Sequence, residues 1–379
     1  MHYTNPARRK LIRVKDILNR RIFVYGKGTG FDTLRSFVLA KFDIQVVGVI
    51  DKRFDKPTVL DSILHGNLSV FTTKGAIGSD DVVIVSIGSQ KIFQELKMEL
   101  MSRTGANVVW ALDIWEYHLS HTSPIFLDTL DEFLRTNREI IASTRELYED
   151  EKSRFVFDGV MNFFSTNEIT EQAIPRDPLS TQYFPNDFSL PRGNARFING
   201  GAYDGDTLRS MITNLGSLGE KTVCFEPDLV NYGRLTENLS QLPESVKGEV
   251  VCLPLGLGEN CQRLRFRSGS SVNSAVDLTG SEELTVVSID QALPNFDPTF
   301  INMDIEGSEE QALRGAIRTI SKSKPDLAIC VYHSLQQFLA IPNFLSALNF
   351  GYRFRLRNYT GFPAETVLYA TALNFLTRP

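Results

Sequence analysis

The stretch RFINGGAYDGDT, residues 196–207, joins an apolar run to a glycine-rich turn and then to the first residues of a helix. A strand, a turn and a helix in this order are the repeating unit of α/β domains. Gly201 and Gly205 would let the backbone approach a ligand closely, because glycine tolerates conformations that other residues avoid. Asp206 or Thr207 can cap the helix that follows. The stretch therefore predicts an α/β domain with a ligand-binding turn.

The next apolar run strengthens this prediction because it ends in an acidic residue. The run at residues 223–226 ends at Glu226. Pro227 follows it and has no amide hydrogen, so the strand cannot continue its hydrogen bonds. In nucleotide-binding α/β folds, an acid at the end of the second strand accepts hydrogen bonds from the ribose hydroxyls. The alternative is that Glu226 is an ordinary surface acid. We expect it at the ligand-binding edge of the sheet.

Short apolar runs alternate with helical segments from residue 21 to about 115, and again from residue 195. This alternation predicts parallel sheets with helices on both faces. Between them, residues 124–167 have helical spacing, and residues 174–191 are rich in proline and polar side chains. We expect strands at 21–25, 45–51, 81–87, 107–112, 196–199, 222–226, 249–253, 300–305 and 326–332, and a terminal β-hairpin at 352–358 and 365–370.

Composition excludes several classes of protein. The 379 residues carry 40 Lys plus Arg against 45 Asp plus Glu, a net charge of −5, which argues against a nucleic-acid partner. An apolar fraction of 42% is enough for packed cores. No apolar run approaches the roughly 18 residues of a membrane span. The basic N-terminus indicates the solvated face of a helix. The four cysteines form no CxxC pair and are expected as free thiols, so we place the protein in the cytoplasm.

Five motifs follow one another in register: GAYDGDT at 201–207, FEP at 225–227, NMDIEGSE at 302–309, VYH at 331–333 and ETVLYA at 365–370. Together they resemble the FkbM family of S-adenosylmethionine-dependent methyltransferases. The resemblance extends upstream through residues 147–170 and through QYFP at 182–185.

The alternation of apolar runs and helical segments, together with the resemblance, predicts an α/β fold of two Rossmann-like domains joined by a helical connector. We expect a Rossmann-like N-terminal domain at 1–120, a connector and linker at 121–190, and an FkbM-type methyltransferase domain at 191–379. The last would have a class I methyltransferase sheet that ends in an antiparallel hairpin. The implied function is O-methylation of a hydroxyl on a small-molecule or glycan acceptor, such as a sugar or a secondary metabolite. The N-terminal domain would serve self-association into a homo-oligomer.

The resemblance also implies roles for individual residues. The glycine turn would surround the methionine moiety of S-adenosylmethionine, Glu226 with Pro227 would hold its ribose, and residues 254–258 would lie near its adenine. Asp304 would lie beside the transferred methyl, and His333 at the same edge of the sheet. The expected cofactor-binding residues are Asn199, Gly201, Ala202, Tyr203, Asp204, Gly205, Thr207, Glu226, Pro227 and Asp304.

Two positions depart from the family pattern. Asn199 stands where the family usually has aspartate, so it keeps an acceptor for the cofactor's ammonium group but lacks the charge. Asn358 stands where the family often has histidine, which puts an acceptor contact there in doubt.

Methyl transfer to an alcohol benefits from a general base. We expect His333 to be that base, because the ordinary pKa of histidine suits neutral pH, with Asp304 orienting the acceptor or serving as the alternative base. No metal is expected, because Asp304, Glu306 and Glu309 should not all point to one side. Two further hypotheses are weaker: an anion site on the strand face of Arg263, Arg265 and Arg267, and cofactor contacts from Ser271 and Ser274 in a covering loop.

A second glycine turn, GKGTG at 26–30, also follows an apolar run, and Asp51 ends the next run. This is close to the dinucleotide fingerprint but lacks its last glycine. We therefore predict that this domain does not bind a nicotinamide cofactor tightly. Two alternatives stay open: a nucleotide-sugar or NAD(P)-dependent enzyme that uses this turn, and a non-catalytic nucleotide-binding module.

Overall fold

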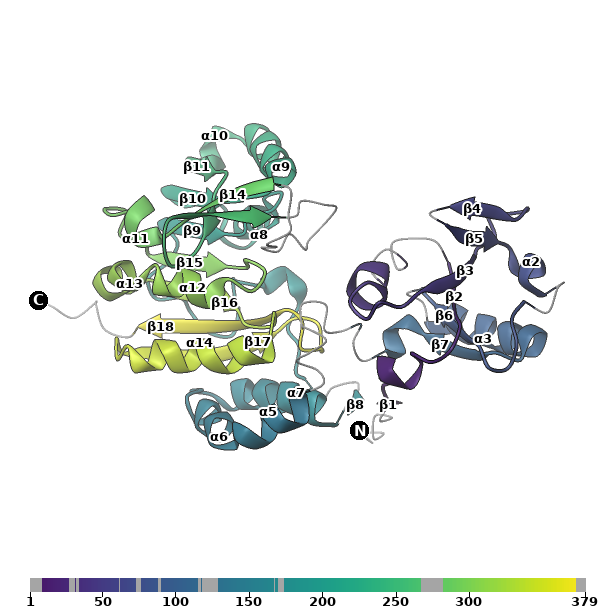
Figure 1. Ribbon diagram of the computed structural model, residues 1–379. Coiled ribbons are helices and arrows are strands. Elements are labelled where there is room, and N and C mark those ends of the chain that lie inside the picture. The colour runs from purple at the N-terminus through teal and green to yellow at the C-terminus, as the bar shows by residue number, and fades with distance from the viewer. Residues whose placement is uncertain are drawn as a thin grey trace, which may run out of the picture. The chain divides into compact units, whose positions relative to one another are not determined.

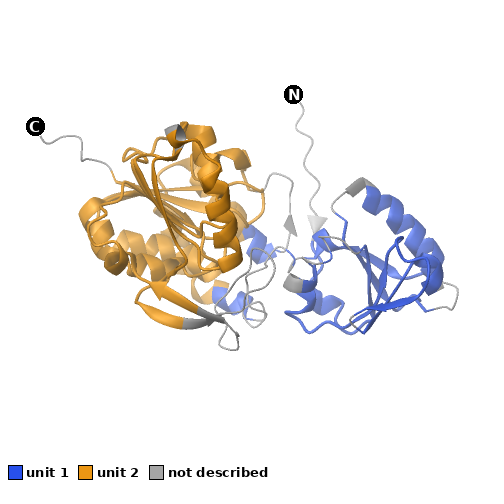
Figure 2. Ribbon diagram, turned by 90° about the horizontal axis from the view of Figure 1, so that it is seen from above, with its two compact units in different colours: residues 1–133, 162–171 blue, residues 134–161, 172–379 orange. Residues whose placement is uncertain are grey.

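The chain divides into two compact units in the computed structural model (Figure 2). Unit 1 comprises residues 1–133 and 162–171, and unit 2 comprises residues 134–161 and 172–379. The structure describes residues 9–26, 31, 34–60, 62–72, 76–87, 90–114, 117, 129–166, 168–169, 174–266 and 282–372.

Unit 1 contains a six-stranded sheet in the order β4-β5-β3-β2-β6-β7, in which only β4 runs antiparallel to its neighbour. All four residues of β2 and of β6 are buried, as expected for the centre of a parallel sheet covered on both faces. The elements are β2 (Ile22–Tyr25), β3 (Val46–Ile50), β4 (Thr58–Leu60), β5 (Ile63–Gly66), β6 (Val82–Val85), β7 (Asn107–Trp110), α2 (Leu68–Thr72) and α3 (Gln90–Thr104). A separate pair joins β1 (Arg9–Lys10) to β8 (Glu168–Ile169).

Unit 2 contains a seven-stranded sheet in the order β11-β10-β9-β15-β16-β18-β17 (Figure 1). Its first five strands are parallel, and β18 runs antiparallel to both β16 and β17. The strands are β9 (Arg196–Gly200), β10 (Lys221–Phe225), β11 (Glu249–Leu253), β15 (Phe300–Met303), β16 (Asp326–Cys330), β17 (Tyr352–Asn358) and β18 (Thr366–Ala372). The prediction of an α/β fold with mainly parallel sheets is confirmed.

Helices and a small second sheet complete unit 2. The helices are α8 (Asp206–Leu215), α9 (Leu229–Ser240), α10 (Glu244–Lys247), α11 (Ile289–Ala292), α12 (Glu309–Arg314), α13 (Ile317–Ser323) and α14 (Leu335–Ala347). The small sheet pairs β12 (Gly256–Leu257) and β13 (Gln262–Phe266) with β14 (Glu282–Val287) between them. No described helix is both long enough and apolar enough to cross a bilayer.

Three helices occupy the predicted connector: α5 (Leu130–Thr136), α6 (Arg138–Glu146) and α7 (Glu151–Thr166). Helix α6 and the first part of α7 pack within unit 2. The ring of Phe157 on α7 stacks on that of Phe338 on α14 at 5.3 Å between centroids. Asn343 donates a hydrogen bond to Thr144 on α6 at 2.5 Å. The predicted bounds 1–120, 121–190 and 191–379 stay a prediction, but packing places residues 134–161 with the second sheet.

The register of the central strands brings their carboxyl ends together. Asn199 on β9 lies beside Cys224 on β10 and beside Asn302 on β15. The residues that follow these strands therefore meet at one edge of the sheet, where ligands bind in open α/β folds.

Candidate functional site

A cavity of about 930 Å³ opens at this edge of unit 2. Its wall includes six of the predicted cofactor-binding residues, namely Gly201, Tyr203, Thr207, Glu226, Pro227 and Asp304. Leu255, Gly256, Leu257 and Gly258 also line it, so most of the segment expected near the adenine borders the same space.

Gly201 holds the glycine turn against the residues that follow β15. Its φ is +78°, and a Cβ at this position would lie 1.8 Å from the carbonyl oxygen of Asp304. Its amide donates a hydrogen bond to Phe225 at 2.9 Å, which ties the turn to the end of β10 as well. Only glycine fits here, because any side chain would occupy the space of the neighbouring backbone.

Glu226 presents its carboxylate on the cavity wall. Oε2 accepts a hydrogen bond from the amide of Tyr203 at 2.8 Å, and Oε1 accepts one from the amide of Asp228 at 2.9 Å. Burial raises the pKa of Glu226 to about 7, in spite of these two hydrogen bonds. Glu226 therefore also fixes the shape of the glycine turn.

Four predicted residues shape the turn without lining the cavity. Ala202 is fully buried in the core, and Gly205 has a φ of +88° where α8 begins. Asp204 pairs with Arg209 at 2.8 Å. Asn199 is fully buried and is not among the residues that line the cavity, so its contact with the cofactor's ammonium group stays a prediction.

Asp304, also on the cavity wall, is surrounded by hydrogen-bond donors. Its carboxylate accepts hydrogen bonds from the hydroxyl of Tyr183 at 3.0 Å and from that of Tyr332 at 3.1 Å. Burial acts to raise the pKa of Asp304, but His333 and the two tyrosines hold it below its ordinary value. Asp304 is thus an ionised acceptor of hydrogen bonds at the cavity wall.

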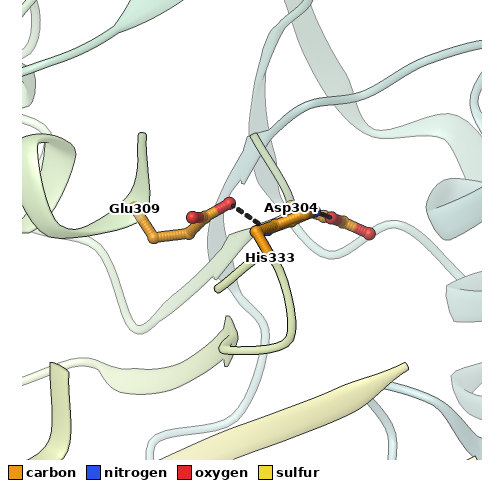
Figure 3. Close-up of side chains that lie close together, drawn as sticks. All are labelled: Asp304, Glu309 and His333. Carbon is orange, nitrogen blue, oxygen red and sulfur yellow. Dashed lines mark ion pairs between the residues drawn. The ribbon is translucent and has the colours of Figure 1, made fainter. Parts of the chain in front are cut away.

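His333 lies behind this wall, between carboxylates (Figure 3). Nδ1 lies 3.0 Å from Oε1 of Glu309, and Nε2 lies 3.3 Å from Oδ1 of Asp304 and 3.7 Å from Oε2 of Glu306. Burial favours the neutral ring, but Glu309 and Asp304 raise the pKa of His333 well above its ordinary value.

The role of His333 as general base stays a prediction, and this arrangement does not favour it. The side chain is 2% exposed and does not line the cavity. An imidazolium whose two nitrogens face carboxylates has no lone pair with which to accept a proton. Sequence reasoning assumed the ordinary histidine pKa, which this cluster of acids changes.

Two further acids line the cavity close to Asp304. Burial raises the pKa of Glu306 to about 8. Burial and the charge of Asp304 raise the pKa of Glu365 to about 7, and the amide of Gln182 donates to its Oε2 at 2.7 Å. These values place both carboxyl groups near the range in which a side chain exchanges protons at neutral pH.

Backbone strain is concentrated on the same wall. Among the described residues other than glycine with positive φ, four line the cavity: Tyr183 at 67°, Tyr203 at 47°, Glu306 at 56° and Glu365 at 55°. Such conformations persist only where the surroundings enforce them, and they gather at functional sites. Sequence reasoning gave no role to Tyr183, Tyr332 or Glu365, although all three fall within motifs that carried the resemblance.

The weaker hypotheses fall largely outside this site. Arg263 is exposed on β13. The side chain of Arg265 lies outside the described part of the structure, and so do the whole of Arg267, Ser271 and Ser274. In unit 1, residues 27–30 of the first glycine turn also lie outside them. The carboxylate of Asp51 is held by the guanidinium of Arg53 at 2.7 Å.

Comparison with known proteins gives a matching family model for part of the chain and a similar fold. Residues 199–354 match the model of the methyltransferase FkbM domain. The crystal structure of a methyltransferase FkbM from Methylobacillus flagellatus KT is similar over 92% of this chain and 89% of that chain, with 24% identity and a TM-score of 0.68. This likeness supports the fold over both units.

Other similar structures cover about half of the chain. An rRNA methylase from Streptococcus thermophilus is 14% identical over 50% of this chain and 93% of its own, with a TM-score of 0.31. A precorrin-6y C5,15-methyltransferase from Geobacter metallireducens GS-15 is 11% identical over 48% of this chain and 85% of its own, with a TM-score of 0.29. No curated protein matches the chain.

Proposed function

Because the chain carries an FkbM methyltransferase domain at residues 199–354, we propose that it transfers a methyl group from S-adenosylmethionine to a hydroxyl of a sugar or secondary-metabolite acceptor. The cofactor supplies a methyl group already activated on a sulfonium sulfur. The protein has to bind the cofactor, position the acceptor and manage its proton.

The cavity fits such a cofactor in size and in chemistry. Its volume of about 930 Å³ lies within the range of small-molecule sites. Gly201 lets the turn pack directly against the backbone of Asp304, and both residues line the cavity. Glu226 would accept hydrogen bonds from the ribose hydroxyls with the lone pairs that its two backbone donors leave available.

The acceptor would enter at the end of the cavity with Asp304 and the two tyrosines. Asp304 can accept a hydrogen bond from an acceptor hydroxyl, and the hydroxyls of Tyr183 and Tyr332 keep its carboxylate in place. The described residues of the cavity wall include several acids, among them Glu259 and Asp304, and no lysine or arginine. A neutral or cationic acceptor suits this wall better than a phosphate or a carboxylate.

We assign the acceptance of the acceptor's proton to Glu365. It lines the same end of the cavity, and its pKa of about 7 matches the task of a general base at neutral pH. Gln182 holds Oε2, so Oε1 is the oxygen that would receive the proton. This replaces the role first expected of His333.

The observation that carries the proposal is Glu226 on the wall of a cavity within the FkbM domain, and cofactor binding tests it. We expect S-adenosylhomocysteine or S-adenosylmethionine to be released when the purified chain is denatured and analysed by liquid chromatography and mass spectrometry. Glu226→Ala should weaken binding by about 2–3 kcal/mol in a calorimetric titration, because two ribose hydroxyls lose a charged acceptor.

Glu249→Gln is the matched control, since it changes a carboxylate at the exposed start of the neighbouring strand β11, where Glu249 pairs with Lys221 at 3.3 Å. Its affinity for S-adenosylmethionine should equal that of the wild type. Equal affinities for wild type and Glu226→Ala would refute the ribose assignment. Failure of both cofactor forms to bind the wild type would refute the proposed function.

A further inference from the structure

We propose that Asp304, Glu306, Glu309 and His333 form a binding site for one divalent cation of the magnesium or manganese class. This inference does not depend on the methyltransferase activity. Among the described residues, Asp304, Glu309 and His333 form a group of ligands that could surround a metal ion. Glu306 lies beside them, with Oε2 3.7 Å from Nε2 of His333.

The ligand atoms are close enough to share one ion. One ligand atom each of Asp304, Glu309 and His333 lies within 4.8 Å of the others. Nε2 of His333 lies 3.3 Å from Oδ1 of Asp304 and 3.7 Å from Oε2 of Glu306. Ligands about 2.1 Å from an octahedral ion are about 3 Å apart. Small rotations of these side chains would therefore complete the set.

Glu309 gives an independent indication of a missing partner. The residue is fully buried at the start of α12, where Oε1 accepts hydrogen bonds from the amides of Ile305 at 2.8 Å and Gly307 at 3.3 Å. Its other oxygen, Oε2, is buried and has no hydrogen-bond partner among the described residues. A buried carboxylate oxygen without a partner is costly, and a cation beside it would remove that cost.

The pairing of His333 with buried acids is also typical of metal sites. A histidine ligand usually presents its second nitrogen to a carboxylate, which fixes the orientation of the ring. Here Nδ1 faces Glu309 at 3.0 Å (Figure 3), while Nε2 faces Asp304 at 3.3 Å and Glu306 at 3.7 Å. An ion bound at Nε2 would take the place of the proton that this nitrogen carries in the metal-free cluster. Three carboxylates surround one imidazole, so the negative charge of the cluster is not fully compensated and a cation would be attracted to it.

Most of the ligand atoms in this cluster are carboxylate oxygens, and one is an imidazole nitrogen. Such a set favours a hard divalent ion over a soft one. Asp304 and Glu306 line the cavity, which gives the ion a path from solvent and places it beside the proposed acceptor end. There it could contact an acceptor oxygen and make its hydroxyl more acidic. That consequence, unlike the site itself, rests on the proposed function.

Titration of the full chain with Mn²⁺ tests the site directly. After removal of bound metal with a chelator, we expect one Mn²⁺ per chain by calorimetry and by the loss of the free-ion signal in electron paramagnetic resonance. Asp304→Asn and Glu309→Gln should each weaken Mn²⁺ binding by about 10- to 100-fold. Glu310→Gln is the control, because Glu310 neighbours Glu309 on α12 but pairs with Arg314 at 2.7 Å.

A circular dichroism melt of each variant verifies that it is folded, and an anomalous difference map from crystals soaked in Mn²⁺ locates the ion independently of the variants. Density between Asp304 and His333 supports the site. No Mn²⁺ binding at millimolar concentration, or equal binding by wild type, Asp304→Asn and Glu309→Gln, overturns it. A chain that binds S-adenosylmethionine but not Mn²⁺ refutes this inference alone, and the reverse result refutes the proposed function alone.

Discussion

At the scale of single residues, Gly201 is the glycine at which the neighbouring backbone leaves least space for a side chain. Its φ is positive, and the carbonyl oxygen of Asp304 lies only 1.8 Å from the place that a Cβ would take. We expect Gly201→Ala to lower the free energy of unfolding by more than the roughly 1–2 kcal/mol that a left-handed conformation alone costs an L-residue. Urea denaturation followed by circular dichroism measures this difference.

Gly216→Ala separates the cost of the left-handed backbone conformation from the cost of the steric overlap. Gly216 ends α8 with a φ of +86°, and nothing lies within 4 Å of a Cβ there. This variant should lose only the conformational cost. Equal losses for the two variants would show that the turn moves away from Asp304 at little cost, and that the close approach is not a constraint.

At the scale of elements, the loop before α7 is attached to strand β17 through a buried arginine. Arg357, with 3% of its side chain exposed, pairs with Asp150 at 2.9 Å and with Asp187 at 2.9 Å. It also donates to Ser153 on α7 at 2.9 Å. We expect Arg357→Ala to destabilise the protein by about 2–3 kcal/mol in urea denaturation, because the variant loses several charge-assisted hydrogen bonds of a buried guanidinium.

Arg353 on the same strand provides the comparison. It pairs with Glu149 at 2.7 Å, but 52% of its side chain is exposed. Solvent screens such a pair, so Arg353→Ala should cost less than about 1 kcal/mol. A loss for Arg357→Ala as small as that for Arg353→Ala would mean that α7 and its preceding loop do not depend on this contact.

At the scale of the whole molecule, the two units should differ in the cofactors that they bind. In unit 1 the carboxylate of Asp51 already accepts hydrogen bonds from the side chain of Arg53 at 2.9 and 2.7 Å, so a ribose would have to displace a cation. We expect 1 mM NAD or NADP to leave the melting temperature within about 1 °C of that of the free protein. S-adenosylhomocysteine at 100 times its Kd should raise it by about 5–10 °C. A clear rise with NAD or NADP in differential scanning fluorimetry would favour the two-cofactor alternative.

Much of the fold could be predicted because the central strands are continuous apolar runs. The expected strands at 196–199, 249–253 and 326–332 correspond to β9, β11 and β16 with ends that differ by at most two residues. The short strands β4, β5 and β12 were missed. Their two to four residues carry no apolar run that distinguishes a strand from a turn.

The α/β class, the glycine turn at 201–205 and the acid at 226 could be inferred from the sequence alone, because each depends on neighbours along the chain. The surroundings of His333 became visible only in the folded chain, since Asp304 and Glu309 precede it by more than a helix and a strand. It likewise brought Tyr183 onto Asp304 and packed residues 134–161 with the second sheet. Burial and charge at these positions come from groups that are distant in the sequence, and no local pattern records them.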